Sequence, residues 1–153
     1  MKGVVAGEYR ITVGDGRSTE QVVATGDYGY AHSCVISENF PLKSLGVKTR
    51  DLVLLEFADD VMSNDAIAEA ARLDLTRPTY EDALYFGAQH RDVQRQRPVV
   101  FLHEPWLGYF GRLDVLCLWT NAGRRELGLV GFDDPRTSDD WLAFVRPAIP
   151  TPR

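Results

Sequence analysis

The chain has 153 residues, of which 44% are hydrophobic and 25% are charged, and its net charge at pH 7 is −5. This length and balance fit one globular domain that buries a core of its own. Because affinity for DNA or RNA depends mainly on neutralising phosphates with Lys and Arg, the acidic balance argues against general nucleic-acid binding.

The first part of the chain predicts a strand and a short helix. Residues 4–13 alternate loosely between apolar and polar side chains and end at a Gly-Asp-Gly turn, which is typical of a strand. Ser18 and Gln21 have the spacing of a capping box, in which each side chain satisfies a backbone N–H of the first helical turn. They predict one or two helical turns that stop at Gly26. The aromatic and apolar stretch 28–36 is expected to be extended.

The middle of the chain predicts a buried strand followed by two helices. Residues 48–58 carry a nearly continuous apolar run, as expected of a strand covered on both faces. Ser63 is the expected N-cap of a helix over 64–74. A second helix begins at a Thr-x-x-Asp capping box that starts at Thr79. Gly87 within this helix costs about 1 kcal/mol relative to alanine, which indicates a close backbone contact on that side.

Four strands are predicted after the second helix, over residues 98–102, 113–120, 124–130 and 141–146. The second and third form a hairpin in which Gly123 accepts positive φ. The order of elements predicts a single α+β domain, with a mainly antiparallel sheet and two principal helices on one side of it. Within this domain we distinguish an N-terminal extension, a core and a Pro-rich tail, which cover residues 1–45, 46–146 and 147–153.

Cysteine content and hydropathy indicate the compartment. Cys34 and Cys117 are the only cysteines, too few for a disulfide framework, and we expect both to be reduced and mostly buried. Residues 1–8 contain no apolar run of signal-peptide length. No segment approaches the ~20 apolar residues of a membrane span. We therefore expect a soluble cytoplasmic protein without membrane contact, in a bacterium or in a cell that a phage or plasmid has entered.

The order of strand, helix, Arg-Pro-Thr, helix and antiparallel strands resembles the C-type-lectin-like fold in its bacterial, disulfide-free form. Residues 77–79 match the Arg-(Leu)-Pro-Thr-x-x-Glu helix start of formylglycine-generating-type proteins and phage receptor-binding proteins, with Asp82 in place of Glu. Residues 144–146 match the aromatic-x-Arg end of their last strand. The pattern also resembles a group of small uncharacterised bacterial proteins, over residues 48–146. The resemblance implies ligand binding through loops and exposed strands, while the function itself has to be argued from a site.

Two segments, around Glu104 and around Asn121, are similar to the triplets that flank a calcium-type sugar site. Glu104 and Asn121 would supply side-chain oxygens, and Asp114 a third. Calcium takes roughly six to eight oxygens, and Trp106 stands where Asn or Asp is usual, so an exposed loop beside a core tryptophan is the simpler interpretation. The histidines show no H-x-x-x-H or H-E-x-x-H spacing for zinc. We expect no metal site and no cofactor.

Two pairs of side chains are candidates for catalysis. His103 and Glu104 are adjacent, and adjacent residues of a strand face opposite ways, so we do not expect them to act together as acid and base. His32 and Cys34 are two residues apart and would share one face of a strand, where the imidazole could activate the thiol. An incidental cysteine in a strand is the competing interpretation. A small hydrolase or thiol-dependent enzyme is therefore the alternative function.

The glycine-flanked loop 103–111 carries three aromatic rings, those of Trp106, Tyr109 and Phe110. Either these rings cap the core, or a rigid sheet holds them in water as anchors of a binding surface. On the second interpretation we expect a non-catalytic binding module that recognises a protein or a small polar ligand. Glu104 and an acidic loop would add charge complementarity for a partner such as a basic protein. The acidic side chains of that loop are Asp133, Asp134, Asp139 and Asp140.

Overall fold

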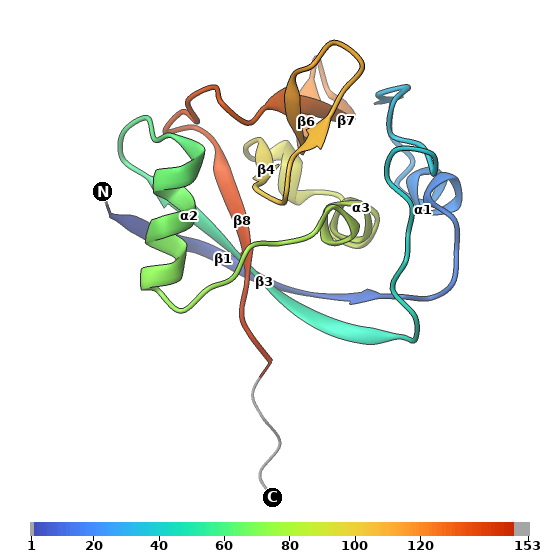
Figure 1. Ribbon diagram of the computed structural model, residues 1–153, viewed down its shortest axis with the longest axis horizontal. Helices are drawn as coiled ribbons and strands as arrows, with labels where there is room; N and C mark the ends of the chain where they lie inside the picture. The colour runs from blue at the N-terminus through green and yellow to red at the C-terminus, as the bar shows by residue number, and fades with distance from the viewer. Residues whose placement is uncertain (1, 149–153) are drawn as a thin grey trace, which may run out of the picture.

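The computed structural model describes residues 2–148 and shows one sheet flanked by helices (Figure 1). The helices are α1 (Thr19–Thr25), α2 (Ser63–Arg72), α3 (Tyr80–Gln89) and the 3-10 helix η1 (Val93–Arg95). The strands are β1 (Gly3–Val13), β2 (Tyr30–Ala31), β3 (Lys48–Phe57), β4 (Val99–Phe101), β5 (Trp106–Leu107), β6 (Leu113–Asn121), β7 (Arg124–Gly131) and β8 (Trp141–Val145). The predicted single-domain α+β class is confirmed.

The strands form an 8-stranded sheet in the order β1-β3-β8-β4-β6-β7-β2, with β5 pairing β6. Most neighbours are antiparallel, as predicted, while β4 runs parallel to β8 and β2 runs parallel to β7. The segment that we separated as an N-terminal extension contributes to this sheet. Its strand β1 pairs with β3 from Gly3 opposite Phe57 to Val13 opposite Lys48.

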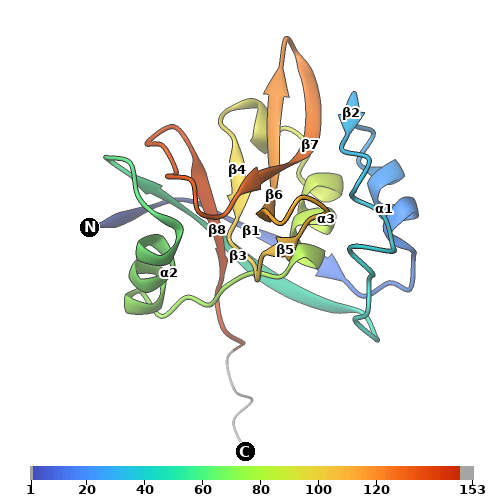
Figure 2. The same ribbon diagram turned by 45° about the horizontal axis from the view of Figure 1, so that its top comes forward.

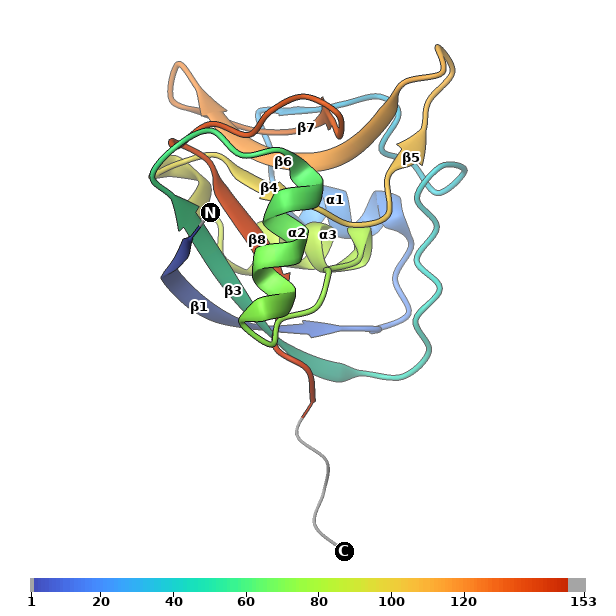
Figure 3. The ribbon, with the colours of Figure 1, turned by 60° about the vertical axis from the view of Figure 1, so that its left-hand side comes forward.

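The sheet is covered on both faces, and the two longer helices lie on opposite faces (Figure 3). Leu54 of β3 points into the cluster that α1 and α3 cover, whereas its neighbour Val53 points into the cluster under α2. The prediction that both helices lie on one side is therefore wrong. The linker between them is pinned to the end of β8, where Thr76 and Val145 exchange backbone hydrogen bonds of 2.8 and 2.9 Å. This pinned linker carries the chain from one face of the sheet to the other.

Capping boxes set the starts of α1 and α3, as predicted. Thr79 Oγ1 accepts a hydrogen bond from the Asp82 N–H at 3.3 Å, and the Asp82 carboxylate accepts one from the Thr79 N–H at 2.8 Å. Ser18 and Gln21 form the same reciprocal pair in α1. Asp82 also accepts two hydrogen bonds from Arg50, at 2.9 and 2.7 Å. This bidentate ion pair satisfies a carboxylate that is almost fully buried.

Helix α2 begins one residue away from the predicted cap. Its N-cap is Met62, and Ser63 is the first helical residue. The Ser63 hydroxyl donates a 2.6 Å hydrogen bond to the Phe132 carbonyl, in the loop after β7. The Ser63 hydroxyl, which the local sequence pattern assigns to capping the helix, therefore forms a tertiary contact with the loop after β7 instead.

The close backbone contact predicted at Gly87 of α3 is confirmed. A Cβ atom at this position would lie 1.8 Å from the Tyr28 hydroxyl, so a glycine is required for Tyr28 to pack across the helix. Arg125 of β7 lies over the Tyr28 ring, with its guanidinium carbon 4.7 Å from the ring centroid. Burial raises the pKa of Tyr28 to about 12. The stack ties α3 to β7 through the segment that leads into β2.

The segment 28–36 is extended only over β2, so the longer extended stretch predicted there is wrong. After the His32 N–H bonds to the Leu127 carbonyl, the chain leaves the sheet edge. It then turns, because the His32 carbonyl accepts from the Val35 N–H at 3.0 Å and the Ile36 carbonyl accepts from the Phe40 N–H at 2.8 Å.

The predicted C-terminal strands are present as β4, β6, β7 and β8, each within one residue of its expected bounds. Ala122 and Gly123 close the β6–β7 hairpin at φ values of 50° and 81°. Strand β5 was not predicted. Most of the Pro-rich tail, residues 149–153, lies outside the described residues. Within residues 2–148, no helix has the length and apolar character that crossing a membrane requires.

Candidate functional site

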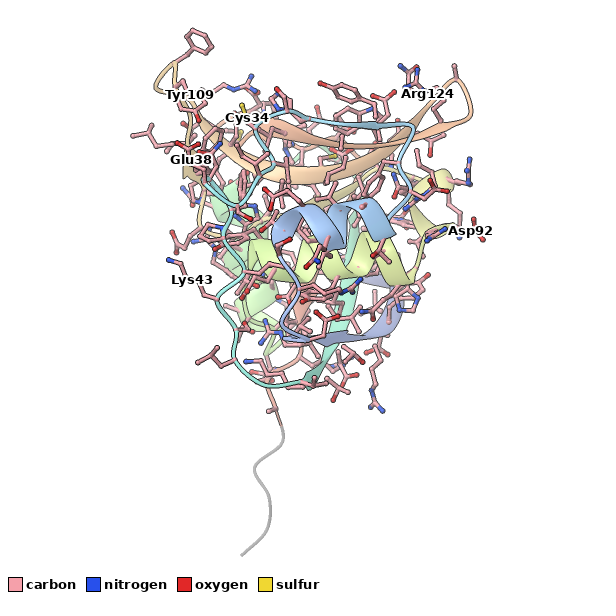
Figure 4. All side chains as sticks on the ribbon, turned by 90° about the vertical axis from the view of Figure 1, so that its right-hand side faces the viewer. Cys34, Glu38, Lys43, Asp92, Tyr109 and Arg124 are labelled. Atoms are coloured by element: carbon pink, nitrogen blue, oxygen red, sulfur yellow. The ribbon has the colours of Figure 1, made fainter. Side chains whose placement is uncertain are left out.

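A pocket of about 320 Å³ opens where β5, β6 and β7 meet the turns after β2. Small-molecule sites have volumes of roughly 300–1,000 Å³, so the pocket is of a size for a small ligand. Figure 2 shows β5 beside β6, and Figure 4 places Cys34 and Tyr109 at the end of the β6–β7 hairpin opposite Arg124. We call it the Trp106 pocket. It is lined by His32, Cys34, Trp106, Gly108, Tyr109, Phe110, Arg112, Asp114 and Leu129.

The aromatic wall of the Trp106 pocket is anchored at one end and exposed at the other. Trp106 packs on Phe40 of the core at a centroid distance of 5.3 Å. Tyr109 stands perpendicular to Trp106, with an interplanar angle of 89° and centroids 5.7 Å apart. Tyr109 is 68% exposed and Phe110 is fully exposed. Tyr109 and Phe110 are therefore exposed, as the second interpretation of the loop requires. Trp106 is half-buried because it also packs against the core.

The backbone holds this aromatic loop in one orientation. Strand β5 pairs with β6, so that Trp106 lies opposite Asp114. The Gly108 N–H then donates to the Arg112 carbonyl at 3.0 Å, which closes a tight turn. Gly111 has a φ of 77°, the left-handed region that glycine accepts without steric cost. The rings are therefore presented by a short, hydrogen-bonded turn.

Two segments that are distant in sequence are joined across the mouth of the pocket by Asn39. The Tyr109 hydroxyl donates to Asn39 Oδ1 at 3.2 Å, and Asn39 Nδ2 donates to the Cys34 carbonyl at 2.9 Å. This chain of hydrogen bonds connects the aromatic loop to the turns after β2. It links two walls of the pocket through one side chain.

Asp114 contributes a buried carboxylate to the pocket. Its side chain is 9% exposed, and no donor within residues 2–148 forms a hydrogen bond to Oδ1. Arg112 Nε lies 2.6 Å from this oxygen and forms an ion pair with it that does not meet hydrogen-bond geometry. A buried polar atom without a partner costs about 1–3 kcal/mol, so this oxygen calls for an explanation.

His32 and Cys34 both line the pocket, but not as neighbours on a strand. They lie in a turn, where His32 Nδ1 accepts a 3.0 Å hydrogen bond from the Cys34 backbone N–H. This bond occupies one ring nitrogen and leaves only Nε2 for any work on a ligand or thiol. Cys34 is half-buried, Cys117 is buried, and neither forms a disulfide. The strand geometry assumed for this pair is wrong, while their convergence on one pocket is real.

His103 and Glu104 do not converge, as expected. His103 is buried, its Nε2 accepts from the Leu116 N–H at 3.0 Å, and its Nδ1 bonds to the Glu104 carbonyl at 2.6 Å. Burial lowers the pKa of His103 to about 4, so the ring is neutral at pH 7. The Glu104 carboxylate lies outside and pairs with Arg77 at 2.7 Å. His103 is a satisfied core residue that positions β6.

The oxygens considered for calcium are far apart along β6. Glu104 precedes β5, which pairs with the start of β6, whereas Asn121 ends β6 at the hairpin. Over the described part of the chain, no group of three or more His, Cys, Asp and Glu side chains is arranged to hold a metal ion.

The acidic loop does not line the Trp106 pocket. Asp133, Asp134 and Asp139 are exposed, while Asp140 is half-buried and accepts from the Thr137 N–H at 3.1 Å. Burial raises the pKa of Asp140 above its ordinary value. Arg136 is buried beneath the loop and donates to the carbonyls of residues 131 and 134, which shapes it.

Sequence reasoning missed the polar floor of the pocket, which Arg112 and Asp114 form. Arg112 was not singled out, and Asp114 was considered only as a calcium ligand. Leu129, an apolar lining residue, was not singled out either. The available signal was Asp114 itself, the one charged residue inside the apolar run from Leu113 to Trp119. A charge within a buried strand either has a partner or marks a site.

Comparison of the chain with family models, with curated proteins and with solved structures gives no match.

Proposed function

We propose that the protein is a non-catalytic binding module that holds a small polar ligand, or a side chain of a partner protein, in the Trp106 pocket. The observation that carries this proposal is the meeting of exposed aromatic rings with a buried carboxylate that lacks a donor. Apolar walls with a few convergent polar groups are the usual composition of a ligand site. Aromatic side chains supply large contact area and lose little conformational freedom on binding.

The acidic loop would act as a second surface, for a basic protein partner. Asp133, Asp134 and Asp139 are exposed on it, and the chain carries a net charge of −5, so a basic surface would be attracted. Glu104 is exposed as well, although Arg77 neutralises it in part. The resemblance to C-type-lectin-like proteins supports binding through loops in the same general way, and it stays a hypothesis carried by residues 77–79 and 144–146.

Titration of a fragment set into ¹⁵N-labelled protein tests the proposal. Polar fragments with an aromatic or aliphatic body should shift the indole signal of Trp106 and the amide signals of residues 32–34, and leave the indole of Trp141 unmoved. Phe110→Ala should weaken these shifts, because it removes a fully exposed ring from the pocket wall. Leu45→Ala is the matched control, since Leu45 is 96% exposed and does not line the pocket.

The proposal fails if no fragment moves these signals, or if Leu45→Ala weakens binding as much as Phe110→Ala does. Trp106→Ala is a poor probe, because Trp106 packs on Phe40 and its truncation would open the core. Phe110→Ala leaves the core intact, so a loss of binding there cannot be ascribed to unfolding.

The alternative is a thiol-dependent enzyme, which is favoured by the presence of His32 and Cys34 in the same pocket. Reaction of Cys34 with iodoacetamide at neutral pH distinguishes the two functions, because such reactivity reports thiolate character. A rate far above that of free cysteine, abolished in Cys34→Ser and reduced in His32→Asn, would favour the enzyme. A rate near or below that of free cysteine would favour the binding module.

A further inference from the structure

The polar floor of the Trp106 pocket indicates the charge of its ligand. Asp114 presents a carboxylate that is nine-tenths buried and has no hydrogen bond to Oδ1 from any residue that the structure describes. A ligand with an anionic group would be repelled by this carboxylate, whereas a positively charged group would be attracted to it.

The walls above Asp114 favour the same charge. Trp106 and Tyr109 stand perpendicular, with their centroids 5.7 Å apart, and so form an aromatic corner over the start of β6. The faces of aromatic rings carry negative charge density and attract cations within about 6 Å of the ring centroid. Phe110 adds a third, fully exposed ring at the rim.

We propose that the Trp106 pocket binds an organic ammonium ion, in particular a methylated one, with its charge above Asp114 and its methyl groups against Trp106 and Tyr109. Methylation suits this corner because methyl groups spread the charge over an apolar surface that packs on ring faces. This inference rests on the proposed function, since it names the ligand class of the same pocket.

Arg112 is the internal competitor of such a ligand. Its guanidinium lies 2.6 Å from Asp114 without a directed hydrogen bond, and its side chain is 61% exposed, so it can move into water at little cost. When a ligand cation takes its place, the Asp114 charge stays neutralised. Glu38 is exposed on the side of the molecule where Figure 4 labels Cys34 and Tyr109, and it adds negative charge to that side.

Isothermal titration calorimetry with choline and with its uncharged isostere 3,3-dimethylbutan-1-ol isolates the role of the charge. Choline should bind at least about tenfold more tightly, because the two molecules share their shape and differ in the cation. A short peptide containing trimethyllysine, compared with free choline, shows whether the ammonium group comes from a protein partner or from a small molecule.

Two substitutions on the floor should act in opposite directions. Asp114→Asn keeps the shape of the side chain, removes its charge and should weaken choline binding about tenfold or more. Arg112→Ala removes the competing cation and should tighten choline binding several-fold. Asp133→Asn is the matched control, since it makes the same charge change on the acidic loop, outside the pocket. It should leave the choline affinity unchanged.

The inference is overturned if the isostere binds as well as choline, or if Asp114→Asn binds choline like the natural chain. Its failure is distinguishable from that of the proposed function. Fragments that shift the Trp106 indole signal while neither choline nor the trimethyllysine peptide binds would leave a ligand site with a different preference. Absence of any shift with any fragment would remove the site itself.

Discussion

Two charged side chains on neighbouring strands, Arg125 of β7 and Asp114 of β6, are both more than nine-tenths buried, and they differ in what surrounds them. The Arg125 guanidinium donates to the carbonyl groups of Arg91 and Gly87 at 2.8 and 2.7 Å, and also to the Gly26 carbonyl and the Gln94 side chain. Asp114 Oδ1 has no donor among residues 2–148. Arg125 lies between packed elements, whereas Asp114 opens onto a pocket.

The two charges differ in hydrogen-bond satisfaction: Arg125, packed between elements, donates to four groups, whereas Oδ1 of Asp114, on which the proposed site rests, accepts no hydrogen bond. Two histidines differ in the same way, because His103 bonds through both ring nitrogens inside the core while His32 bonds through one at the pocket; His90, outside the Trp106 pocket, also bonds through one, to the Arg10 carbonyl. An unsatisfied atom alone is not enough. The Tyr28 hydroxyl also lacks a hydrogen bond, but it is packed against Gly87 and lines no pocket described here. A site requires both an unpartnered polar group and space beside it.

Removing Arg125 should have the largest effect on stability. Arg125→Met should lower the free energy of unfolding by about 3 kcal/mol, because it leaves several buried carbonyl groups without a donor. Urea denaturation followed by circular dichroism measures the change. Arg10→Met is the control, since Arg10 is exposed and its ion pair with Asp51 lies in water, so its removal should change little. Equal losses in the two variants would break the distinction drawn for Arg125.

His103 should make stability depend on pH. Its pKa is about 4 in the folded state, against 6.5 for a free histidine, because burial disfavours the charged ring. As the pH falls, His103 is therefore protonated in the unfolded chain before it is protonated in the folded chain. The contribution of the neutral ring to the free energy of unfolding is complete above pH 6.5 and is lost as the pH falls from 6.5 to 4. The loss should be on the order of 3 kcal/mol.

Urea denaturation at a series of pH values checks this, with His103→Gln as the variant that lacks the titrating ring. The slope between pH 6.5 and 4 should flatten in His103→Gln, even if that variant is less stable throughout. Glu69 affects stability at lower pH than His103 does. Its hydrogen bonds with Arg72 lower its pKa to about 2, so its contribution to the free energy of unfolding is lost only below pH 4.5 and does not hide the effect of His103. An unchanged slope in His103→Gln would show that folding does not lower the pKa of His103.

Local signals predicted most of this fold. Capping boxes at Ser18 and Thr79 located two helices, and the apolar run of β3 identified a strand buried on both faces. Two features depended on contacts remote in sequence and were not predictable in this way. The linker that carries the chain from one face of the sheet to the other is held by the contact of Thr76 with Val145, and β2 ends because the chain turns away after the His32 N–H bonds to the Leu127 carbonyl, although β7 continues to Gly131.

The site was predictable only in part, for the same reason. The aromatic loop stands out because Trp106, Tyr109 and Phe110 occur close together between glycines. Asp114 follows only a few residues later, but its role depends on the pairing of β5 with β6, and a two-residue strand leaves almost no periodic signal. His32 and Cys34 reach the pocket through turns, which the i, i+2 rule for strands does not describe.

The smallest effect on stability is expected at Asp114, in contrast to the large effect expected at Arg125. Asp114→Asn should leave the free energy of unfolding unchanged or raise it by up to about 1 kcal/mol, because burying an amide costs less than burying a carboxylate without a donor. Arg112→Ala, measured beside it by urea denaturation, separates the loss of the ion pair from the loss of the buried charge. If Asp114→Asn instead destabilised the protein as much as Arg125→Met does, Asp114 would be a structural charge like Arg125. If the charge of Asp114 can be removed without loss of stability, then burial of this carboxylate in the pocket costs the folded protein free energy. Binding of a cation would offset that cost.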